Sequence, residues 1–107
     1  MFGLTSKDID LIIKVLRSHS DVEEAVLFGS RAMGNYKPGS DVDIALKGSL
    51  LSDTCGDIAV ELNERLPLPY QFDLVVYDDI IHEPLREHID RYGKTLYKKE
   101  SSTIGDK

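Results

Sequence analysis

Hydrophobic residues near the start of the chain recur every three or four positions, which places them on one face of a helix. They are Ile9, Ile12, Ile13 and Leu16. Thr5 and Asp8 stand at the beginning of this pattern with the spacing of a capping pair. The pattern therefore predicts an amphipathic helix over residues 4–18.

The next hydrophobic segment is a short apolar run over residues 22–28, and we expect a strand there. The run stops at Gly29-Ser30, after which residues 30–34 are expected to form a helical turn. A loop over residues 35–40 follows, because its Asn, Pro, Gly and Ser residues are typical of loops.

Two further segments alternate between apolar and other residues, as strands with one apolar face do. Residues 41–46 carry the first alternation, and residues 72–77 carry the second. The apolar positions are Val42, Ile44 and Leu46 in the first segment and Phe72, Leu74 and Val76 in the second. Acidic side chains therefore lie on the face opposite the apolar one in both strands.

The remaining segments predict two helices and a short edge strand. Residues 52–66 form the second amphipathic helix, and residues 78–92 form the third, which Gly93 ends. Pro84 is unfavourable inside a helix, so the alternative is that the third helix begins there after a separate turn. Residues 96–97 are expected to form the edge strand.

This order of elements predicts a small α/β (α+β) domain, in which helices flank a mixed sheet of three or four strands. We expect residues 1–100 to form one domain and residues 101–107 to be a flexible C-terminal tail.

Charge and composition exclude several classes of protein. The chain of 107 residues has 13 Lys and Arg against 19 Asp and Glu, a net charge of −6, so direct nucleic-acid binding is not expected. The single cysteine, Cys55, rules out an intrachain disulfide. No apolar run approaches the roughly 20 residues of a membrane span, and no signal-peptide pattern is present. We therefore expect a cytoplasmic protein without a membrane partner.

Three aspartates are the candidate metal ligands. Asp41 and Asp43 lie two residues apart on a strand, which places their carboxylates on one face about 7 Å apart. Unpaired carboxylates so close repel, and a divalent cation between them relieves the repulsion. Oxygen ligands favour Mg²⁺ or Mn²⁺ over zinc. If Asp73 lies on the neighbouring strand, three carboxylates could hold two ions for a phosphoryl displacement, and Asp73 could accept the attacking group's proton.

The Gly29-Ser30 step is the candidate phosphate-binding turn. Glycine after a strand lets the backbone approach a phosphate, and a helical turn from Ser30 directs N–H groups and a hydroxyl at it. Arg31 could add a cation for a nucleotide, or pair with a carboxylate instead. The segment is not a P-loop, because no Gly-Lys-Ser/Thr follows.

Each of these features has a plainer interpretation when taken alone. An Asp-x-Asp pair is mostly a solvated strand edge, and Gly-Ser after a strand is usually a simple turn. Asp73 differs, because an ionised group within an apolar strand needs a partner. The combination on one predicted face favours a metal–phosphate site. The histidines at positions 19, 82 and 88 do not cluster with one another or with Cys55 at zinc spacing, so we expect no catalytic role for them.

The spacing of these motifs resembles a known family. Gly29-Ser30, ten intervening residues and Asp41-x-Asp43 resemble the signature of the DNA polymerase β-like nucleotidyltransferase superfamily. Asp73 falls where that family's third carboxylate is expected. The segment Gly-Ser-Arg-Ala-x-Gly at residues 29–34 is most similar to the minimal nucleotidyltransferase (MNT) branch.

The resemblance implies a polymerase β palm-like fold and a magnesium-dependent transfer of AMP from ATP, with release of pyrophosphate. Asp41 and Asp43 would bind both metal ions, and Asp73 would bind the catalytic ion and assist deprotonation. Gly29 and Ser30 would hold the β- and γ-phosphates. Small MNT proteins resemble antitoxins that adenylylate a tyrosine of a HEPN-domain toxin, so a hetero-oligomer with such a toxin is expected.

Two alternatives stay open at this point. The chain could be an antitoxin with a vestigial site that acts by contact alone, although such a site need not keep all three carboxylates. It could also be a small-molecule nucleotidyltransferase in which a homodimer builds the acceptor pocket. The length of 107 residues leaves no room for an acceptor-binding domain, so we expect another chain to hold the acceptor.

Overall fold

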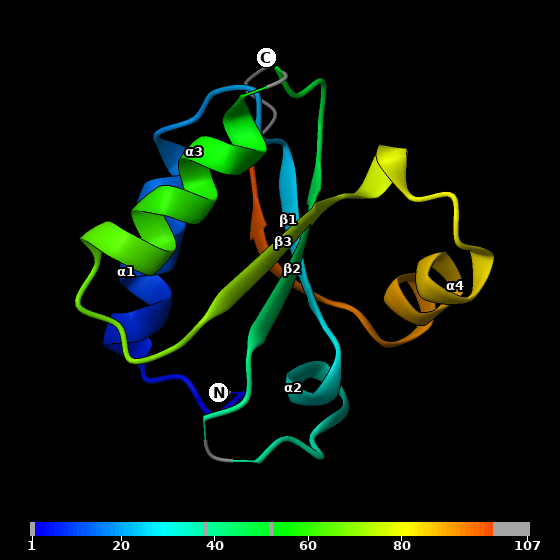
Figure 1. Cartoon of the computed structure of the whole chain (residues 1–107), viewed down its shortest axis with the longest axis horizontal. Coiled ribbons are helices and arrows are strands. Elements are labelled where there is room, and N and C mark those ends of the chain that lie inside the picture. Colours follow the sequence, from blue (N-terminus) through cyan, green and yellow to red (C-terminus); the bar gives the residue numbers. More distant parts are fainter. Residues whose placement is uncertain (1, 38, 52, 100–107) are drawn as a thin grey trace, which may run out of the picture.

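A four-stranded mixed sheet forms the centre of the computed structural model, which describes residues 2–37, 39–51 and 53–99 (Figure 1). The strands are β1 (Glu24–Phe28), β2 (Val42–Lys47), β3 (Phe72–Val76) and β4 (Lys94–Lys98). Their order across the sheet is β3-β2-β1-β4. β1 pairs antiparallel with both β2 and β4, whereas β3 pairs parallel with β2. The predicted mixed α/β sheet flanked by helices is confirmed.

The helices are α1 (Ser6–Arg17), α2 (Ser30–Met33), α3 (Thr54–Val60) and α4 (Glu83–Tyr92). Thr5 caps α1 as expected: its hydroxyl accepts a hydrogen bond from the Asp8 N–H at 3.0 Å, and the Asp8 carboxylate accepts one from the Thr5 N–H at 3.1 Å. This reciprocal pair satisfies two N–H groups that would otherwise lack partners at the helix start.

Two predicted helices differ in detail from the structure. The helix expected over residues 52–66 becomes α3 followed by a π-helical turn, η1 (Glu61–Arg65). The alternative for the third helix is confirmed, because a 3₁₀ turn, η2 (Tyr77–Asp79), precedes α4 and Pro84 lies in the first turn of α4. Proline is tolerated there because first-turn N–H groups have no partner within the helix.

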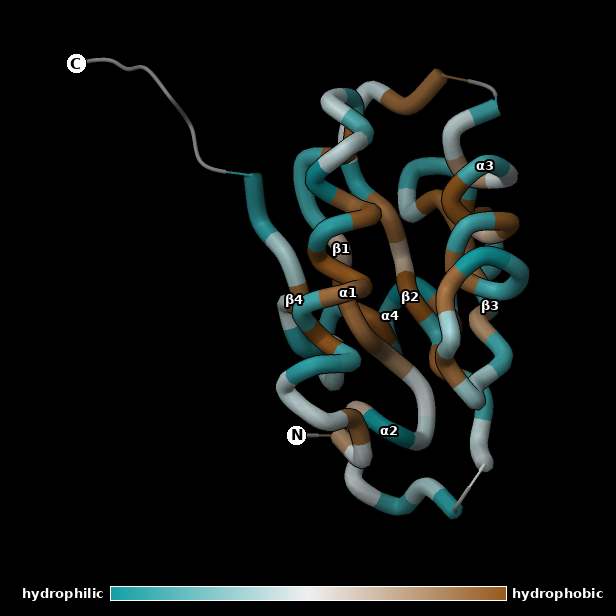
Figure 2. The backbone as a smooth tube through the Cα atoms, turned by 90° about the vertical axis from the view of Figure 1, so that its left-hand side faces the viewer, coloured by the Kyte–Doolittle hydropathy of each residue, from teal (hydrophilic) through white to brown (hydrophobic). Residues whose placement is uncertain are grey.

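The sheet separates two hydrophobic clusters, one on each face. Helices α1 and α3 cover one face and α4 covers the other (Figure 1). Apolar residues concentrate along β1, β2 and the inner side of α1 (Figure 2). Alternation along β2 divides the clusters: Ile44 and Leu46 pack with α1 and α3, whereas Ala45 packs with Ile80 and Ile89 on the α4 side. The side chain of Asp43 is therefore directed to the α4 face.

The ends of the chain add two observations. β4 is the predicted edge strand, and it is longer than the two residues expected. The predicted tail, residues 101–107, lies outside the described residues. Within the described ranges, no helix combines the length and apolar character that a bilayer crossing requires.

Candidate active site

A row of side chains crosses three strands on the α4 face of the sheet. Asp43 of β2 is the register partner of Asp73 in the parallel strand β3 and of Phe28 in the antiparallel strand β1. Residues in register on neighbouring strands point to the same face. The topology therefore places the carboxylates of Asp43 and Asp73 side by side, as the predicted site requires.

Burial and like charge disfavour the ionised form of Asp43 in this arrangement. Burial raises the pKa of Asp43 above its ordinary value, and the neighbouring charges of Asp73 and Asp41 raise it further. His88 and Arg31 oppose this shift. Among residues 2–37, 39–51 and 53–99, no basic side chain forms an ion pair with any of the three aspartates. A site that holds repelling carboxylates without a cationic partner is suited to a metal ion.

Asp41 lies one residue before β2 rather than within it, and its side chain is exposed. No three Asp, Glu, His or Cys side chains in the described part of the chain stand together as ligands for one ion. Asp41, Asp43 and Asp73 therefore do not form a single three-ligand group in the described part of the chain, although the sequence predicted that their carboxylates could converge.

The Gly29-Ser30 turn lies directly against Asp43. Gly29 links β1 to α2 with φ 78° and ψ −156°, a conformation essentially restricted to glycine. A Cβ at this position would collide with Oδ2 of Asp43, so the backbone of the turn is in contact with the carboxylate. The structure thus brings together Gly29, Ser30, Asp43 and Asp73, four of the six predicted site residues, with Asp41 beside them.

Arg31 is buried, and backbone carbonyls occupy its guanidinium. Its side chain is 3% exposed, and the guanidinium donates hydrogen bonds to the carbonyl of Phe2 at 2.9 Å and to that of Ser40 at 2.8 Å. The rings of Tyr36 and Tyr70 lie over it, each 5.1 Å from the guanidinium carbon. Arg31 therefore fixes the loop that enters Asp41. A direct phosphate contact would require these hydrogen bonds to break.

His88 lies at the site, although the sequence offered no reason to place it there. Its Nε2 accepts a hydrogen bond from the Gly29 N–H at 3.0 Å across 59 residues of sequence. No local pattern on α4 indicates this contact, because it depends on how α4 packs against the end of β1. His19 and His82 do not join it.

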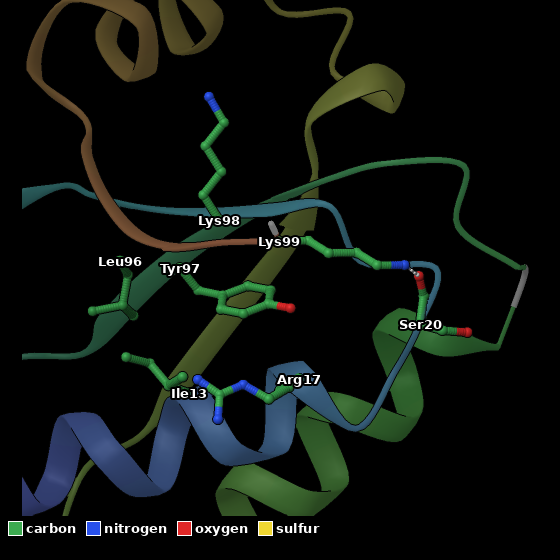
Figure 3. A pocket seen from close by; sticks show the side chains of 7 residues that line it. All are labelled: Ile13, Arg17, Ser20, Leu96, Tyr97, Lys98 and Lys99. Carbon is green, nitrogen blue, oxygen red and sulfur yellow. Dashed lines mark hydrogen bonds between the residues drawn. The ribbon is translucent and has the colours of Figure 1, made fainter. Parts of the chain in front are cut away.

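A cavity of about 500 Å³ lies elsewhere, between α1 and β4 (Figure 3). Ile13 and Arg17 of α1 and Tyr97 of β4 are among its lining residues, and Lys99 donates to the Ser20 carbonyl at 2.9 Å (Figure 3). None of the predicted site residues lines it. This cavity is therefore separate from the candidate site formed by the carboxylates and the Gly29-Ser30 turn.

Comparison with known proteins agrees with this geometry. The family model "Polymerase beta, Nucleotidyltransferase" matches residues 7–102. No curated protein sequence matches the chain. Among solved structures, the crystal structure of a toxin–antitoxin with AMP-PNP is similar at TM-score 0.69 and 27% identity, over 86% of this chain and 74% of that one.

Two further structures share the fold. A complex of a Shewanella oneidensis tri-AMPylated HEPN toxin with an MNT antitoxin is similar at TM-score 0.67 and 24% identity, over 90% of this chain and 74% of that one. The toxin–antitoxin MntA-HepT gives TM-score 0.66 and 24% identity, over 89% and 74%. The predicted resemblance is confirmed, and the chain belongs to the polymerase β nucleotidyltransferase family.

Proposed function

We propose that this protein transfers AMP from ATP to a tyrosine hydroxyl of a HEPN-family partner in a magnesium-dependent reaction that releases pyrophosphate. The observation that carries the proposal is the register pair of Asp43 and Asp73 beside the Gly29-Ser30 turn. This arrangement places these carboxylates next to a backbone turn that a phosphate can approach closely.

The carboxylates fit a divalent cation. Burial and like charges raise the pKa of Asp43 despite the opposing effect of His88 and Arg31, and no described basic side chain forms an ion pair with it, so a cation beside it would relieve the remaining repulsion. We propose that Asp41, Asp43 and Asp73 hold two Mg²⁺ ions, which Mn²⁺ could replace. When bound, such ions polarise the phosphoryl oxygens and stabilise negative charge on the attacking and leaving oxygens.

The chain's own groups would orient the reactants. In this proposal Gly29 and Ser30 hold the β- and γ-phosphates, and Arg31 supports nucleotide binding by fixing the loop before Asp41. The tyrosine oxygen forms a bond to the α-phosphorus while the bond from that phosphorus to the bridging oxygen breaks. Pyrophosphate leaves, and the phenolic proton passes to the carboxylate of Asp73, which is exposed and therefore accessible to an acceptor.

The comparisons support the choice of nucleotide and partner. The structural neighbour at 27% identity is a toxin–antitoxin with AMP-PNP, an ATP analogue. The acceptor is suggested by the tri-AMPylated HEPN toxin of a second neighbour, whose 24% identity establishes only the shared fold.

Label transfer from α-labelled ATP with Mg²⁺ in host lysate tests the proposal. We would compare the native chain with Asp41→Asn/Asp43→Asn, and use Asp10→Asn, an exposed acid on α1, as the matched control. The proposal expects an RNase-resistant labelled protein band that the control retains and the double variant loses. Label confined to small molecules would indicate a small-molecule transferase. Absence of label with any nucleoside triphosphate, in a protein that still binds a partner, would indicate inhibition by contact.

A further inference from the structure

His88 joins α4 to the turn at the end of β1. Its Nε2 lies 3.0 Å from the Gly29 nitrogen and accepts that N–H. The imidazole is partly buried between two aromatic rings, with centroid distances of 6.2 Å to Phe28 and 5.5 Å to Tyr92. Because Nε2 is the acceptor, the proton of the neutral ring is on Nδ1. The ring is thus held in place by packing, and its Nε2 accepts a hydrogen bond from the Gly29 N–H.

The peptide that His88 binds is the one whose placement matters most at the site. Gly29 has a glycine-only conformation, and its Cα lies against the Asp43 carboxylate. Rotation of the Gly29 peptide would change the distance between the turn and Asp43. Phe28, which precedes Gly29 and packs on the same imidazole, is the register partner of Asp43. The contacts of His88 therefore restrain the turn relative to the carboxylates.

We propose that His88 is a positioning residue for nucleotide binding: its Nε2 holds the Gly29 peptide in the conformation that the phosphates of a nucleoside triphosphate require. His88 makes no contact with the nucleotide in this proposal and acts through Gly29. The inference rests on the proposed function in one respect, namely that the Gly29-Ser30 turn is the phosphate contact.

Two substitutions separate the hydrogen bond from the packing. His88→Phe keeps an aromatic ring beside Phe28 and Tyr92 but removes the acceptor. His88→Gln keeps an acceptor on a flexible side chain of similar reach. His82→Phe is the matched control, because His82 is exposed and makes no described side-chain hydrogen bond or ring contact.

The first measurement is amide hydrogen exchange at Gly29, followed by NMR without nucleotide or metal. Loss of a single hydrogen bond of ordinary net strength predicts exchange about fivefold faster in His88→Phe. His88→Gln is expected to restore part of the protection, and His82→Phe to leave it unchanged. Equal exchange at Gly29 in His88→Phe and the native chain would overturn the proposal.

The second measurement is the affinity for Mg²⁺·ATP and the steady-state kinetics of AMP transfer. We expect His88→Phe to weaken binding and raise KM by about fivefold with a smaller change in kcat, because the catalytic carboxylates remain. An unchanged affinity and KM in His88→Phe would show that His88 serves packing alone. If the native chain binds no nucleotide, the proposed function and the role in nucleotide binding both fail. Gly29 exchange then still reports whether His88 holds the turn.

Discussion

Replacing Asp43 with asparagine is expected to stabilise the metal-free protein at neutral pH while abolishing the proposed transfer. The amide keeps the shape of the side chain but removes a charge that the charges of Asp73 and Asp41 both repel. Burial and these two like charges hold the pKa of Asp43 above its ordinary value, so its ionised form is disfavoured in the folded state. Groups that a site holds at a cost to stability are typical of function.

The size of the gain follows from the spacing of the strands. At about 4.8 Å between neighbouring strands, two carboxylates repel by about 0.9 kcal/mol in water and by about 3.5 kcal/mol at an effective dielectric constant of 20. Asp43 is only partly buried and Asp73 is exposed, so the lower figure applies and the free energy of unfolding should rise by about 1 kcal/mol. For a domain of this size, that gain raises Tm by about 4–8 °C.

The raised pKa of Asp43 determines how the stability gain of Asp43→Asn changes with pH. Well below its ordinary pKa of 3.8, Asp43 is protonated in both the folded and the unfolded chain, so its charge does not affect stability there. As pH rises from 3.8 through the raised native pKa, the unfolded chain loses its proton first, so the native protein loses stability. The advantage of Asp43→Asn should therefore be absent in acid and complete at neutral pH.

Urea denaturation followed by circular dichroism, in EDTA and between pH 3.5 and 7.5, measures this difference. Asp10→Asn serves as the control, because Asp10 is exposed on α1. A loss of stability in Asp43→Asn at pH 7, or a gain that does not vary with pH, would refute the electrostatic reasoning.

Three further predictions concern the same site. Millimolar Mg²⁺ should raise the Tm of the native chain and not that of Asp43→Asn, since an ion bound only by the folded state stabilises it. If thermal denaturation shows the same Mg²⁺-induced rise in Tm for both proteins, a metal at Asp43 is excluded. Gly29→Ala should unfold at a lower urea concentration than Gly34→Ala, with a free energy of unfolding lower by at least about 1 kcal/mol, because both glycines have positive φ but only a Cβ at Gly29 meets Asp43. Similar urea midpoints for the two variants would contradict the close contact. Arg31→Met should cost about 2–4 kcal/mol, because it leaves the carbonyls of Phe2 and Ser40 without their donor; a cost below 1 kcal/mol would show that the buried guanidinium is not structural.

Local chemistry explains why much of the fold was predictable. The Thr5–Asp8 capping pair, the apolar face of α1 and the alternation in β2 depend on neighbours within a few residues, and the structure has all of them. The side on which Asp43 and Asp73 lie follows from the two-residue period of a strand. The boundaries of the helices were not fully predictable. The helix expected over residues 52–66 changes to a π-helical turn at Glu61, a change that hydrophobic spacing does not encode.

Sequence by itself identified the candidate site residues, namely the aspartates and the Gly29-Ser30 turn, because their residue types and spacing are properties of the chain. Tertiary structure decided which other residues these candidate site residues contact. The parallel pairing of β2 with β3 sets Asp43 opposite Asp73, and the packing of α4 brings His88 to the Gly29 N–H. The fold also buries Arg31 against the carbonyls of Phe2 and Ser40. These contacts join residues far apart in sequence, and their geometry depends on the docking of whole elements, which no local pattern specifies.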